Sequence, residues 1–558
     1  MSKVTLLAIN AKYVHSSLAV WVLRGGVSRY ARLPHEVEVV EATINQANDG
    51  IADRVADYHP DIVGISVYIW NAGRLPELLR LFRERLPEAV FVLGGPEASH
   101  NATYWLDHGA DFVLRGEGEH GFPALLDALA AHISPESIPS LCWNENGETH
   151  TNPEAEATDG WVDPYDDTYM DALNGKIAYI ETSRGCPFRC AYCLSGGSGV
   201  RFSSLDMAKE QLYRLSQSGA QTIKLVDRTF NCDAGRAYEL FAYIIGLKTT
   251  CCFHFEVAAD LFDERTLSLL AAAPPGRIQL EAGLQSFYPP ALKAVSRKTD
   301  LVKAEQNIRE LLRHKNIHIH LDLIAGLPYE TLSHFQDSFD RAYALDAHTL
   351  QLGFLKLLHG SALRGQAEAL GIRYAEDPPY EIMESPWLST GDIRILKQTE
   401  NTLQHTANKG RFLCALRYVL SVSGLGPFAL YRALGEAIPN RGMALEEYAR
   451  QIYDCCVNLV GVDCHQLLEC MILDWLGMVK GVNMPPFLRN GDRRRRQVIE
   501  AAEKWLGHKI ARHEAAVLPS GQGAFVDSAN RDPVTGLYLV HVVESRRRGG
   551  GIIAEALI

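Results

Sequence analysis

Three cysteines at C-x3-C-x2-C spacing constrain this chain more than any other feature. Cys186, Cys190 and Cys193 follow directly after an apolar run at residues 177–180. Thiolates are soft ligands for iron–sulfur clusters, and three of them leave one iron of a four-iron cluster open to a substrate or cofactor. Buried structural thiols and a zinc site are the alternatives. Structural zinc usually takes a fourth Cys or His at short spacing, and the loop contains none.

Length and composition limit the class of protein. The chain has 558 residues, 47% of them hydrophobic, which is enough for several domains with substantial cores. The formal net charge of −12 argues against a general nucleic-acid binder. Because the sequence shows neither a run of about 18 apolar residues nor a signal-peptide pattern, it predicts no membrane span and no secretion. The 12 cysteines are then typical of a reducing cytoplasm.

The first 135 residues alternate short β-branched runs with segments of helical apolar spacing. The strand-like runs lie at residues 4–9, 37–40, 62–67, 90–93 and 112–114. This alternation predicts a parallel, doubly wound, Rossmann-like α/β sheet. Such sheets bind ligands at the carboxyl ends of their strands, so the turns there hold candidate binding residues. These are His15, Ser16, Ser17, Tyr68, Trp70, Asn71, Gly94, Gly95, Pro96, Glu97, Gly116, Glu117, Gly118 and Glu119.

A polar segment at residues 136–175 is predicted to be a linker, with one strand-like run at 140–143. Residues 176–360 alternate strands and helices again. Their strand-like runs lie at 177–180, 222–226, 252–257, 277–284, 317–324 and 350–355. Six such βα units predict a partial, TIM-like barrel, which carries its chemistry at the carboxyl ends of the strands.

Residues 361–558 are predicted to form a mainly helical domain with a terminal hairpin around 537–543. Four cysteines fall in this region, namely Cys455, Cys456, Cys464 and Cys470. Because two of them are adjacent, they suit buried helix thiols better than a second cluster. Arginine runs at 493–496 and 546–548 are interpreted as solvated faces, with RNA binding as the less favoured alternative.

Tyr192 before the third cysteine and the glycine-rich stretch 195–199 after it complete a motif that resembles the radical S-adenosylmethionine (SAM) superfamily. The resemblance implies a (β/α)6 barrel, a 4Fe-4S cluster on the three cysteines, and SAM bound beside it. Family positions then imply SAM contacts at Tyr192, Glu281, Gln285, Ser286, Ile324 and Gly326. The Gly-Gly-Glu form that holds the SAM amino group is absent after the second strand, where backbone carbonyls or Asp227 would replace it. Arg297 and Lys298 are interpreted as solvated surface, with neutralisation of a carboxylate as the alternative. His318 and His320 are interpreted as buried and hydrogen-bonded rather than metal-binding.

The sequences Gly-Gly-Pro-Glu at 94–97 and Arg-Gly-Glu-Gly-Glu at 115–119, placed before such a motif, resemble the cobalamin-binding domain of B12-dependent radical SAM proteins. Small residues there would let the flat corrin ring approach the backbone. The first loop departs from the Asp-x-His-x-x-Gly pattern, in which the His ligates cobalt. His15 lacks the Asp, the spacing and the Gly, so hydrogen bonding is favoured over ligation.

The whole chain resembles a bacterial family in which an uncharacterised C-terminal domain follows the B12-binding and radical SAM domains. That resemblance implies a cytoplasmic methyltransferase, which uses a 5′-deoxyadenosyl radical and methylcobalamin to methylate an unactivated carbon. A small-molecule or natural-product substrate and an electron donor such as flavodoxin or ferredoxin follow as partners. The sequence fixes neither the substrate nor the catalytic residues.

Three other functions compete with methyl transfer. A cobalamin-dependent radical rearrangement or cyclisation would use the same cofactors. A cobalamin-binding sensor would not need the intact cysteine triad. A tRNA methylthiotransferase would need three more cysteines in its N-terminal domain, whereas only Cys142 precedes the motif.

Overall fold

A computed structural model describes residues 1–156, 160–197, 199–439, 442–478, 483–489, 494–531, 538–544 and 551–557. The chain divides into two compact units. The first unit comprises residues 1–272, 293–299 and 354–386, and the second comprises residues 273–292, 300–353 and 387–558.

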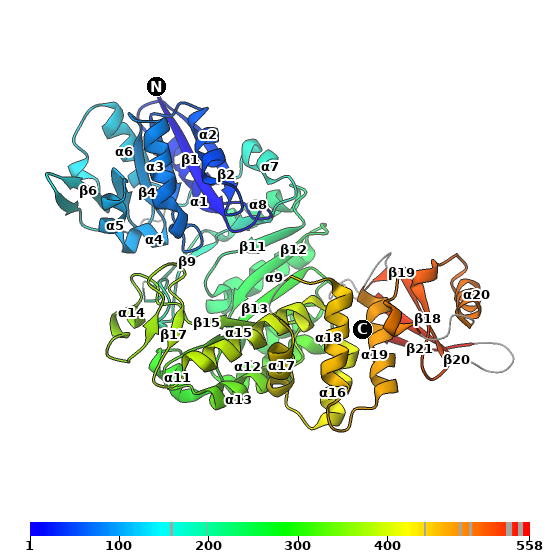
Figure 1. Ribbon diagram of the computed structural model, residues 1–558. Helices are drawn as coiled ribbons and strands as arrows, with labels where there is room; N and C mark the ends of the chain where they lie inside the picture. Colours follow the sequence, from blue (N-terminus) through cyan, green and yellow to red (C-terminus); the bar gives the residue numbers. More distant parts are fainter. Residues whose placement is uncertain are drawn as a thin grey trace. The chain divides into compact units, whose positions relative to one another are not determined.

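The first unit opens with the predicted doubly wound sheet, drawn in blue in Figure 1. Its strand order is β2-β1-β3-β4-β5-β6-β7, and the first five strands are parallel. These five are β1 (Ser2–Asn10), β2 (His35–Thr43), β3 (Ile62–Ser66), β4 (Val90–Gly94) and β5 (Phe112–Leu114). The central strand β3 is buried at every position, as expected where helices cover both faces of a parallel sheet.

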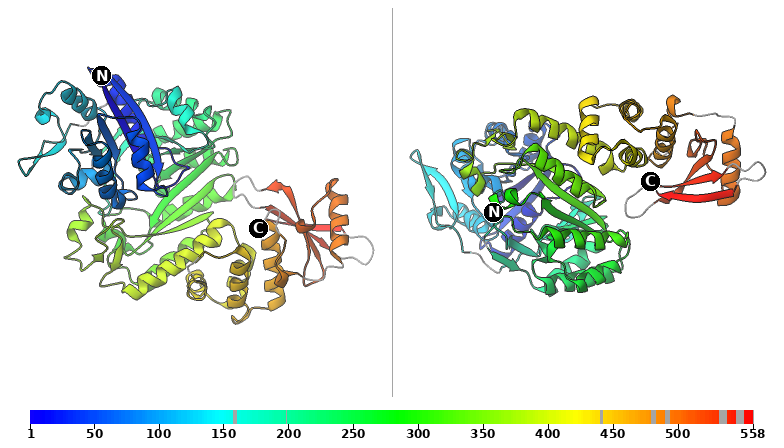
Figure 2. Two further views of the ribbon diagram at one scale, coloured as in Figure 1. Left: turned by 45° about the horizontal axis from the view of Figure 1, so that its top comes forward. Right: turned by 90° about the horizontal axis from the view of Figure 1, so that it is seen from below.

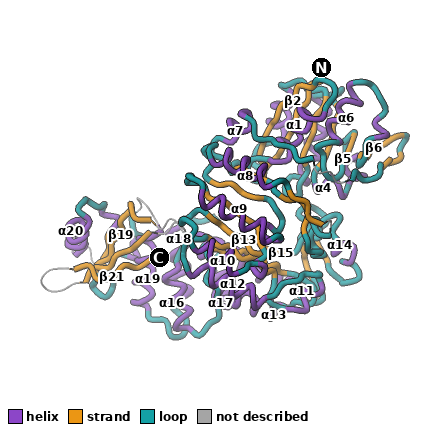
Figure 3. Tube along the Cα trace, turned by 180° about the vertical axis from the view of Figure 1, so that it is seen from behind, coloured by secondary structure: helices purple, strands orange, loops and turns teal. Residues whose placement is uncertain are grey.

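Helices lie on both faces of this sheet (Figure 3). Helix α1 (Leu18–Tyr30) contacts α6 (Gly121–Ala130), while α2 (Asn48–Ala56) contacts α3 (Leu75–Arg85). Two short helices, α4 (Pro96–His100) and α5 (Ala102–Asp107), follow β4. The segment predicted as a linker adds an antiparallel hairpin to the sheet edge, β6 (Leu141–Glu145) and β7 (Glu148–Thr151), before α7 (Asp167–Leu173).

The second large sheet has the six strands that the sequence predicts, in the order β15-β14-β13-β12-β11-β8. The first unit contains β8 (Ala178–Ile180), β11 (Thr222–Leu225) and β12 (Cys252–Val257), with α8 (Leu205–Ser216), α9 (Ala234–Gly246) and α10 (Glu264–Ala271). The second unit contains β13 (Ile278–Gln285), β14 (His318–Ala325) and β15 (Thr349–Phe354), with α12 (Leu301–Arg313) and α13 (Leu332–Tyr343). Four shorter elements complete this part of the chain, namely α11 (Pro289–Ala294), α14 (Ala362–Gln366), β16 (Arg373–Tyr374) and β17 (Ile382–Glu384).

The C-terminal region of the second unit is mainly helical, as predicted. Its helices are α15 (Thr390–His405), α16 (Leu413–Ser423), α17 (Pro427–Ala437), α18 (Leu445–Cys456), α19 (Cys464–Met478) and α20 (Arg495–Leu506). Where the sequence predicts a hairpin, the structure has a four-stranded antiparallel sheet, drawn in red in Figure 2. Its strands are β18 (Ala515–Val517), β19 (Gly523–Arg531), β20 (Tyr538–Glu544) and β21 (Gly551–Leu557). Val498 and Ala502 of α20 pack on Phe525 of this sheet.

No single helix in the described part of the chain is long and apolar enough to cross a membrane. Helices α16 and α17 together meet the length and composition criteria for a span, but the chain bends by 117° between them.

Candidate functional site

The three motif cysteines lie on a loop that a small hairpin closes. Strand β9 (Ser183–Cys186) leads into the loop, and β10 (Gly199–Phe202) leads out of it in antiparallel pairing. Cys190 is buried, whereas Cys186 and Cys193 are half-buried. The Sγ of Cys186 lies 3.4 Å from Thr229 Oγ1, and the Sγ of Cys193 accepts the Ser195 N–H over 3.4 Å. The loop thus presents three thiols from one short segment.

Backbone hydrogen bonds fix this loop from both sides. The N–H of Ala191 donates to Val295 O over 2.9 Å, and Leu363 N–H donates to Ala191 O over 2.8 Å. The interpretation of Arg297 as solvated surface is wrong, because its Nη1 lies 3.8 Å from Cys190 Sγ and its guanidinium lies over the Phe188 ring. A cation therefore stands beside the thiol that is most buried.

A buried carboxylate lies beneath the motif. Asp227 is fully buried and accepts hydrogen bonds from Thr182 N–H over 3.1 Å, Thr182 Oγ1 over 2.7 Å and Ser183 Oγ over 2.5 Å. Burial raises the pKa of Asp227. Since these contacts occupy both of its oxygens, Asp227 orients the strand that enters the cysteine loop.

The acidic turn after β5 reaches the cysteine hairpin. Arg184, two residues before Cys186, pairs with Glu117 over 2.9 Å and also with Glu119. Arg201 of β10 pairs with the second oxygen of Glu117. The predicted binding residues Glu117 and Glu119 therefore place their carboxylates on arginines of the cysteine hairpin.

The loop after β1 is joined to the start of β8. His15 Nδ1 lies 2.6 Å from the hydroxyl of Tyr179, and Ser16 Oγ donates to Ile177 O over 2.8 Å. Burial lowers the pKa of His15. Ser17 donates its N–H to Glu41 Oε1 over 3.3 Å. His15 thus has the hydrogen-bonding role that the sequence favours.

The turn after β3 combines a buried amide with two stacked rings, of which Tyr68 is half-buried and Trp70 is exposed. Asn71 is fully buried, donates to Ser66 O over 3.0 Å and accepts the Tyr68 N–H over 2.9 Å. Tyr68 and Trp70 stack at 4.3 Å, and Trp70 is 45% exposed. Asn71 therefore shapes the turn, while the stacked rings offer a flat apolar surface next to it.

The glycines of the next two turns differ in what surrounds them. A Cβ on Gly95, whose φ is +93°, would lie 2.7 Å from Val67 O, so the fold itself requires glycine there. A Cβ on Gly94 would lie 3.4 Å from Leu114 O, and a Cβ on Gly118 would lie 2.7 Å from Leu23 Cδ2. A Cβ on Gly116, by contrast, would meet no atom within 4 Å. The space above Gly116 is open to a ligand.

Glu97, which follows Pro96 at the start of α4, has its own buried partner. Tyr380 donates its hydroxyl to Glu97 Oε1 over 2.6 Å, and His359 Nε2 lies 4.0 Å from the same oxygen. Burial raises the pKa of Glu97, and burial with Arg364 lowers the pKa of His359 to about 4. The segment after β15 is thus tied to the turn after β4.

In the second unit, the end of β13 carries a strained glutamine. Gln285 has φ +69° and follows a register shift in the pairing with β14. Its buried Oε1 has no hydrogen-bond partner among the described residues. Such strain and such an unmet acceptor concentrate at ligand sites.

Its neighbour Ser286 is fully buried, donates to Glu330 over 2.5 Å, and accepts the Tyr288 N–H over 2.9 Å. These contacts let Ser286 hold the turn after β13 in place. Glu281 lies half-buried on β13, Ile324 near the end of β14, and Gly326, with φ +98°, just after that strand.

One face of β13 and β14 is polar. On β14, Ile319, Leu321 and Leu323 are buried, and the alternating positions 318, 320 and 322 carry His, His and Asp. His320 Nε2 lies 2.9 Å from Gln279 Nε2, and His318 stacks on His348 at 4.5 Å. Among the described residues, no three His, Cys, Asp or Glu side chains are placed to share one metal ion. His318 and His320, which the sequence analysis expects to be buried, are half-buried.

The C-terminal cysteines are spread over several helices. Cys414 of α16 is hydrogen-bonded to Cys470 of α19. Cys456 is buried, Cys455 is half-buried and Cys464 is exposed. Nearby, the fully buried Asp474 accepts the N–H groups of Cys414 and Ala415 over 2.9 Å each, which caps α16. Cys456 and Cys470 are thus buried helix thiols, as predicted, whereas Cys464 is exposed.

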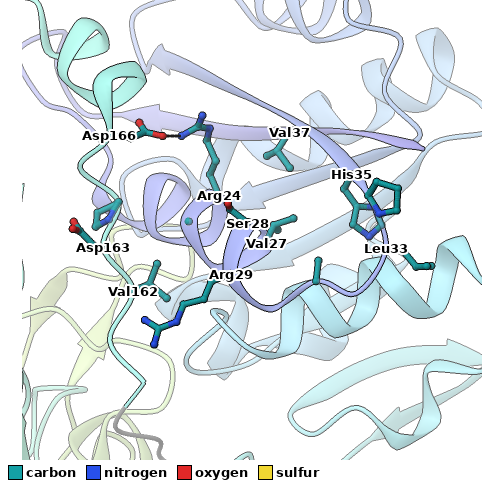
Figure 4. A pocket seen from close by; sticks show the side chains of 14 residues that line it. Arg24, Val27, Ser28, Arg29, Leu33, His35, Val37, Val162, Asp163 and Asp166 are labelled. Atoms are coloured by element: carbon teal, nitrogen blue, oxygen red, sulfur yellow. Dashed lines mark hydrogen bonds and ion pairs between the residues drawn. The ribbon is translucent and has the colours of Figure 1, made fainter.

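A hollow of about 620 Å³ lies elsewhere in the first unit (Figure 4). The end of α1, the start of β2 and residues 162–166 line it, and Arg24 pairs there with Asp166 over 2.5 Å. Because His35 opens β2, this hollow lies at the amino edge of the sheet, opposite the turns described above.

Several residues of this site carry no local sequence signal. Arg184 and Arg201 contact Glu117 only because a hairpin brings them together, and Tyr380 lies 283 residues from Glu97. Arg184 stands two residues before the first motif cysteine, and this position is its one sequence signal.

Three family models match the chain in succession. "B12 binding domain" matches residues 4–126, "Radical SAM superfamily" matches residues 180–342, and "Protein of unknown function (DUF4080)" matches residues 368–519.

Curated relatives and solved structures agree with this order. The 2-(S-pantetheinyl)-carbapenam-3-carboxylate methyltransferase of Streptantibioticus cattleyicolor is 24% identical over 314 residues, which are 52% of this chain and 46% of the relative. The anaerobic magnesium-protoporphyrin IX monomethyl ester cyclase of a Synechocystis species is 26% identical over 303 residues, which are 51% of this chain and 60% of the relative. The chain thus spans about half the length of these relatives.

The structure of the radical SAM methyltransferase TsrM from Kitasatospora setae, with cobalamin and a 4Fe-4S cluster bound, superposes with a TM-score of 0.57 at 20% identity. The match covers 68% of this chain and 79% of that one. At this identity, the likeness establishes the shared fold.

The residues present fit the groups that these domains hold. In a four-iron cluster each cysteine thiolate binds a different iron atom. Three cysteines spaced along one loop therefore fit such a cluster better than they fit one metal ion that all three would have to share. The open space above Gly116 suits a flat ring that approaches the backbone. The unmet Oε1 of Gln285 suits a hydrogen-bond donor of SAM.

Proposed function

We propose that this chain, which matches the B12-binding, radical SAM and DUF4080 family models in succession, is a methyltransferase acting on an unactivated carbon of a small molecule. The observation that carries the proposal is that two candidate cofactor sites lie in one compact unit. The cysteine loop and the turn after β5, a candidate cobalamin contact, meet there through Arg184 and Glu117. The cofactors are cobalamin, a 4Fe-4S cluster and SAM.

The cofactors supply the chemistry of radical formation and methyl transfer, and this chain's residues hold and orient them. Cys186, Cys190 and Cys193 would bind the cluster, while Thr182 and Ser183, fixed by Asp227, set the strand that enters the loop. Gln285 would orient SAM through its amide. Helix α14 contacts the loop through the hydrogen bond from Leu363 N–H to Ala191 O.

A cobalamin-dependent cyclisation without methyl transfer is the second candidate. The magnesium-protoporphyrin cyclase matches 51% of this chain, almost as much as the carbapenam methyltransferase does. The cysteine loop and the turns serve both chemistries equally, so the products of SAM must distinguish them.

For partners, we propose a small-molecule or natural-product substrate and a low-potential electron donor such as flavodoxin or ferredoxin. Twelve free cysteines support a reducing compartment, the cytoplasm. The net charge of −12 does not favour nucleic acid as a substrate.

The test is an analysis of SAM products under anaerobic, reducing conditions with the reconstituted protein. Methyl transfer predicts S-adenosylhomocysteine together with 5′-deoxyadenosine. Cyclisation predicts 5′-deoxyadenosine alone, and a sensor predicts neither product. The Cys186→Ala variant serves as the control, because loss of the cluster must abolish 5′-deoxyadenosine.

A further inference from the structure

The hairpin that closes the cysteine loop contains an opposed pair of like charges. Arg184 of β9 and Arg201 of β10 stand directly opposite each other in the antiparallel register. Like charges at directly opposed positions destabilise a strand pair. An anion shared by both arginines therefore stabilises the closed hairpin.

Glu117 provides that anion from a different part of the fold. One of its oxygens accepts Arg184 Nη1 over 2.9 Å, and the other pairs with Arg201. Glu117 belongs to the turn after β5, at the carboxyl edge of the cobalamin-binding sheet. One carboxylate thus connects both strands of the cysteine hairpin to the turn after β5, which is a candidate cobalamin contact.

The surroundings make this connection difficult to replace. The Arg184 side chain is only 16% exposed and also pairs with Glu181 over 2.7 Å and with Glu119, which is 8% exposed. Its guanidinium lies 5.0 Å from the centre of the Trp161 ring. Glu117 itself is 40% exposed. Its loss would remove the carboxylate that the two opposed arginines share, while Arg184 would keep its pairs with Glu181 and Glu119.

We propose that Glu117 is a positioning residue, which holds the cluster-bearing loop closed and in register with the turn after β5 by neutralising Arg184 and Arg201. This inference rests on the proposed cluster site. Glu117 acts on the cluster through the arginines and does not itself bind iron.

The experiment compares three variants of the full chain. Glu117→Gln removes the charge and keeps the shape. Glu148→Gln, on the exposed β6–β7 hairpin of the same sheet, is the matched control. The double variant Glu117→Gln with Arg201→Gln removes the opposed charge as well. Each protein is reconstituted anaerobically with iron and sulfide, desalted, and exposed to an iron chelator while the cluster absorbance is followed.

We expect Glu117→Gln to lose iron about tenfold faster than the wild type, the change that corresponds to one charged hydrogen bond. The Glu148→Gln control should lose iron at the wild-type rate. The double variant should lose iron at a rate close to that of the wild type, because the opposed charge is gone. The unfolding temperature of the cluster-free Glu117→Gln protein should stay close to that of the control, because the sheet core is untouched.

The inference would be overturned if Glu117→Gln lost iron at the wild-type rate. It would also be overturned if the double variant lost iron as fast as Glu117→Gln alone. Either result leaves the proposed function standing if the wild type still holds about four irons that Cys186→Ala loses. If the reconstituted wild-type protein bound no iron, the proposed function itself would be contradicted.

Discussion

Ser286 donates its hydroxyl to the fully buried carboxyl group of Glu330 over 2.5 Å. Ser338 donates to the same oxygen over 3.2 Å, and the N–H of Tyr288 donates to Ser286 Oγ over 2.9 Å. Ser286 thereby links the end of β13 to the turn after β14.

We expect Ser286→Ala to lower the free energy of unfolding by about 1–3 kcal/mol, because Glu330 stays buried without its closest donor. Thermal unfolding of the cluster-free protein measures this loss, and SAM affinity should change little. An unchanged unfolding temperature with weakened SAM binding would restore Ser286 as a cofactor contact.

Glu330 also gives the protein a pH dependence. Burial raises its pKa from 4.5 to about 7. Between these values the folded protein keeps a proton that the unfolded chain releases, so stability falls as the pH rises through this window. The fall is at most about 1.4 kcal/mol per pH unit for one proton. Glu330→Gln stays neutral and should lose this slope in urea unfolding at pH 5 and pH 7; equal slopes in both proteins would contradict the assignment.

The cysteine triad predicts one four-iron cluster per chain. Anaerobically reconstituted wild-type protein should hold about four irons, and Cys186→Ala, Cys190→Ala or Cys193→Ala should each lose most of them. Replacement of Cys464, an exposed helix cysteine, is the control and should leave the iron content unchanged. Full iron in the triple alanine variant would exclude this loop as the cluster site.

Gly116 gives the sharpest test of where cobalamin binds. Gly116→Asn adds a side chain to open space, and Asn tolerates the positive φ of +69°. If the corrin lies there, retention of hydroxocobalamin after gel filtration should fall sharply while the fold persists. Gly147→Asn is the matched control, with φ +83° and equally open surroundings in the β6–β7 turn. If Gly116→Asn retained hydroxocobalamin as well as the wild type does, the turn at Gly116 would not be part of the cobalamin site.

Gly95→Leu, by contrast, is a poor test of the same idea. Its side chain would strike the Val67 backbone and damage the sheet whether or not cobalamin binds.

Gln285 is expected to contact SAM. Gln285→Ala keeps the positive φ but removes the unmet amide, and loss of one hydrogen bond to a charged group corresponds to about 10–150-fold weaker binding. Equilibrium SAM binding to the anaerobic protein checks this. Gln217→Ala, at the exposed end of α8, should bind SAM normally. Equal affinity in both variants would place Gln285 outside the SAM site.

Strands and cofactor motifs were predictable because their signals are local. The β-branched runs at 62–67 and 252–257 became β3 and β12, since buried parallel strands require such residues. The charged contacts were not predictable in this way. Arg184, Arg201 and Glu117 meet only after a hairpin and a sheet edge have formed, and Arg297 reaches Cys190 across 107 residues. Tertiary placement, which no local pattern encodes, decides whether an arginine faces water or a thiol.

The most direct test of methyl transfer needs no knowledge of the substrate. The cobalamin-loaded, anaerobically reduced protein is incubated with SAM that carries a trideuterated methyl group, and the cobalamin fraction is analysed by mass spectrometry. A methyltransferase predicts the trideuteromethyl mass in the cobalamin fraction, together with one S-adenosylhomocysteine for each label transferred. Unlabelled cobalamin alongside 5′-deoxyadenosine would contradict methyl transfer and favour the cyclisation chemistry.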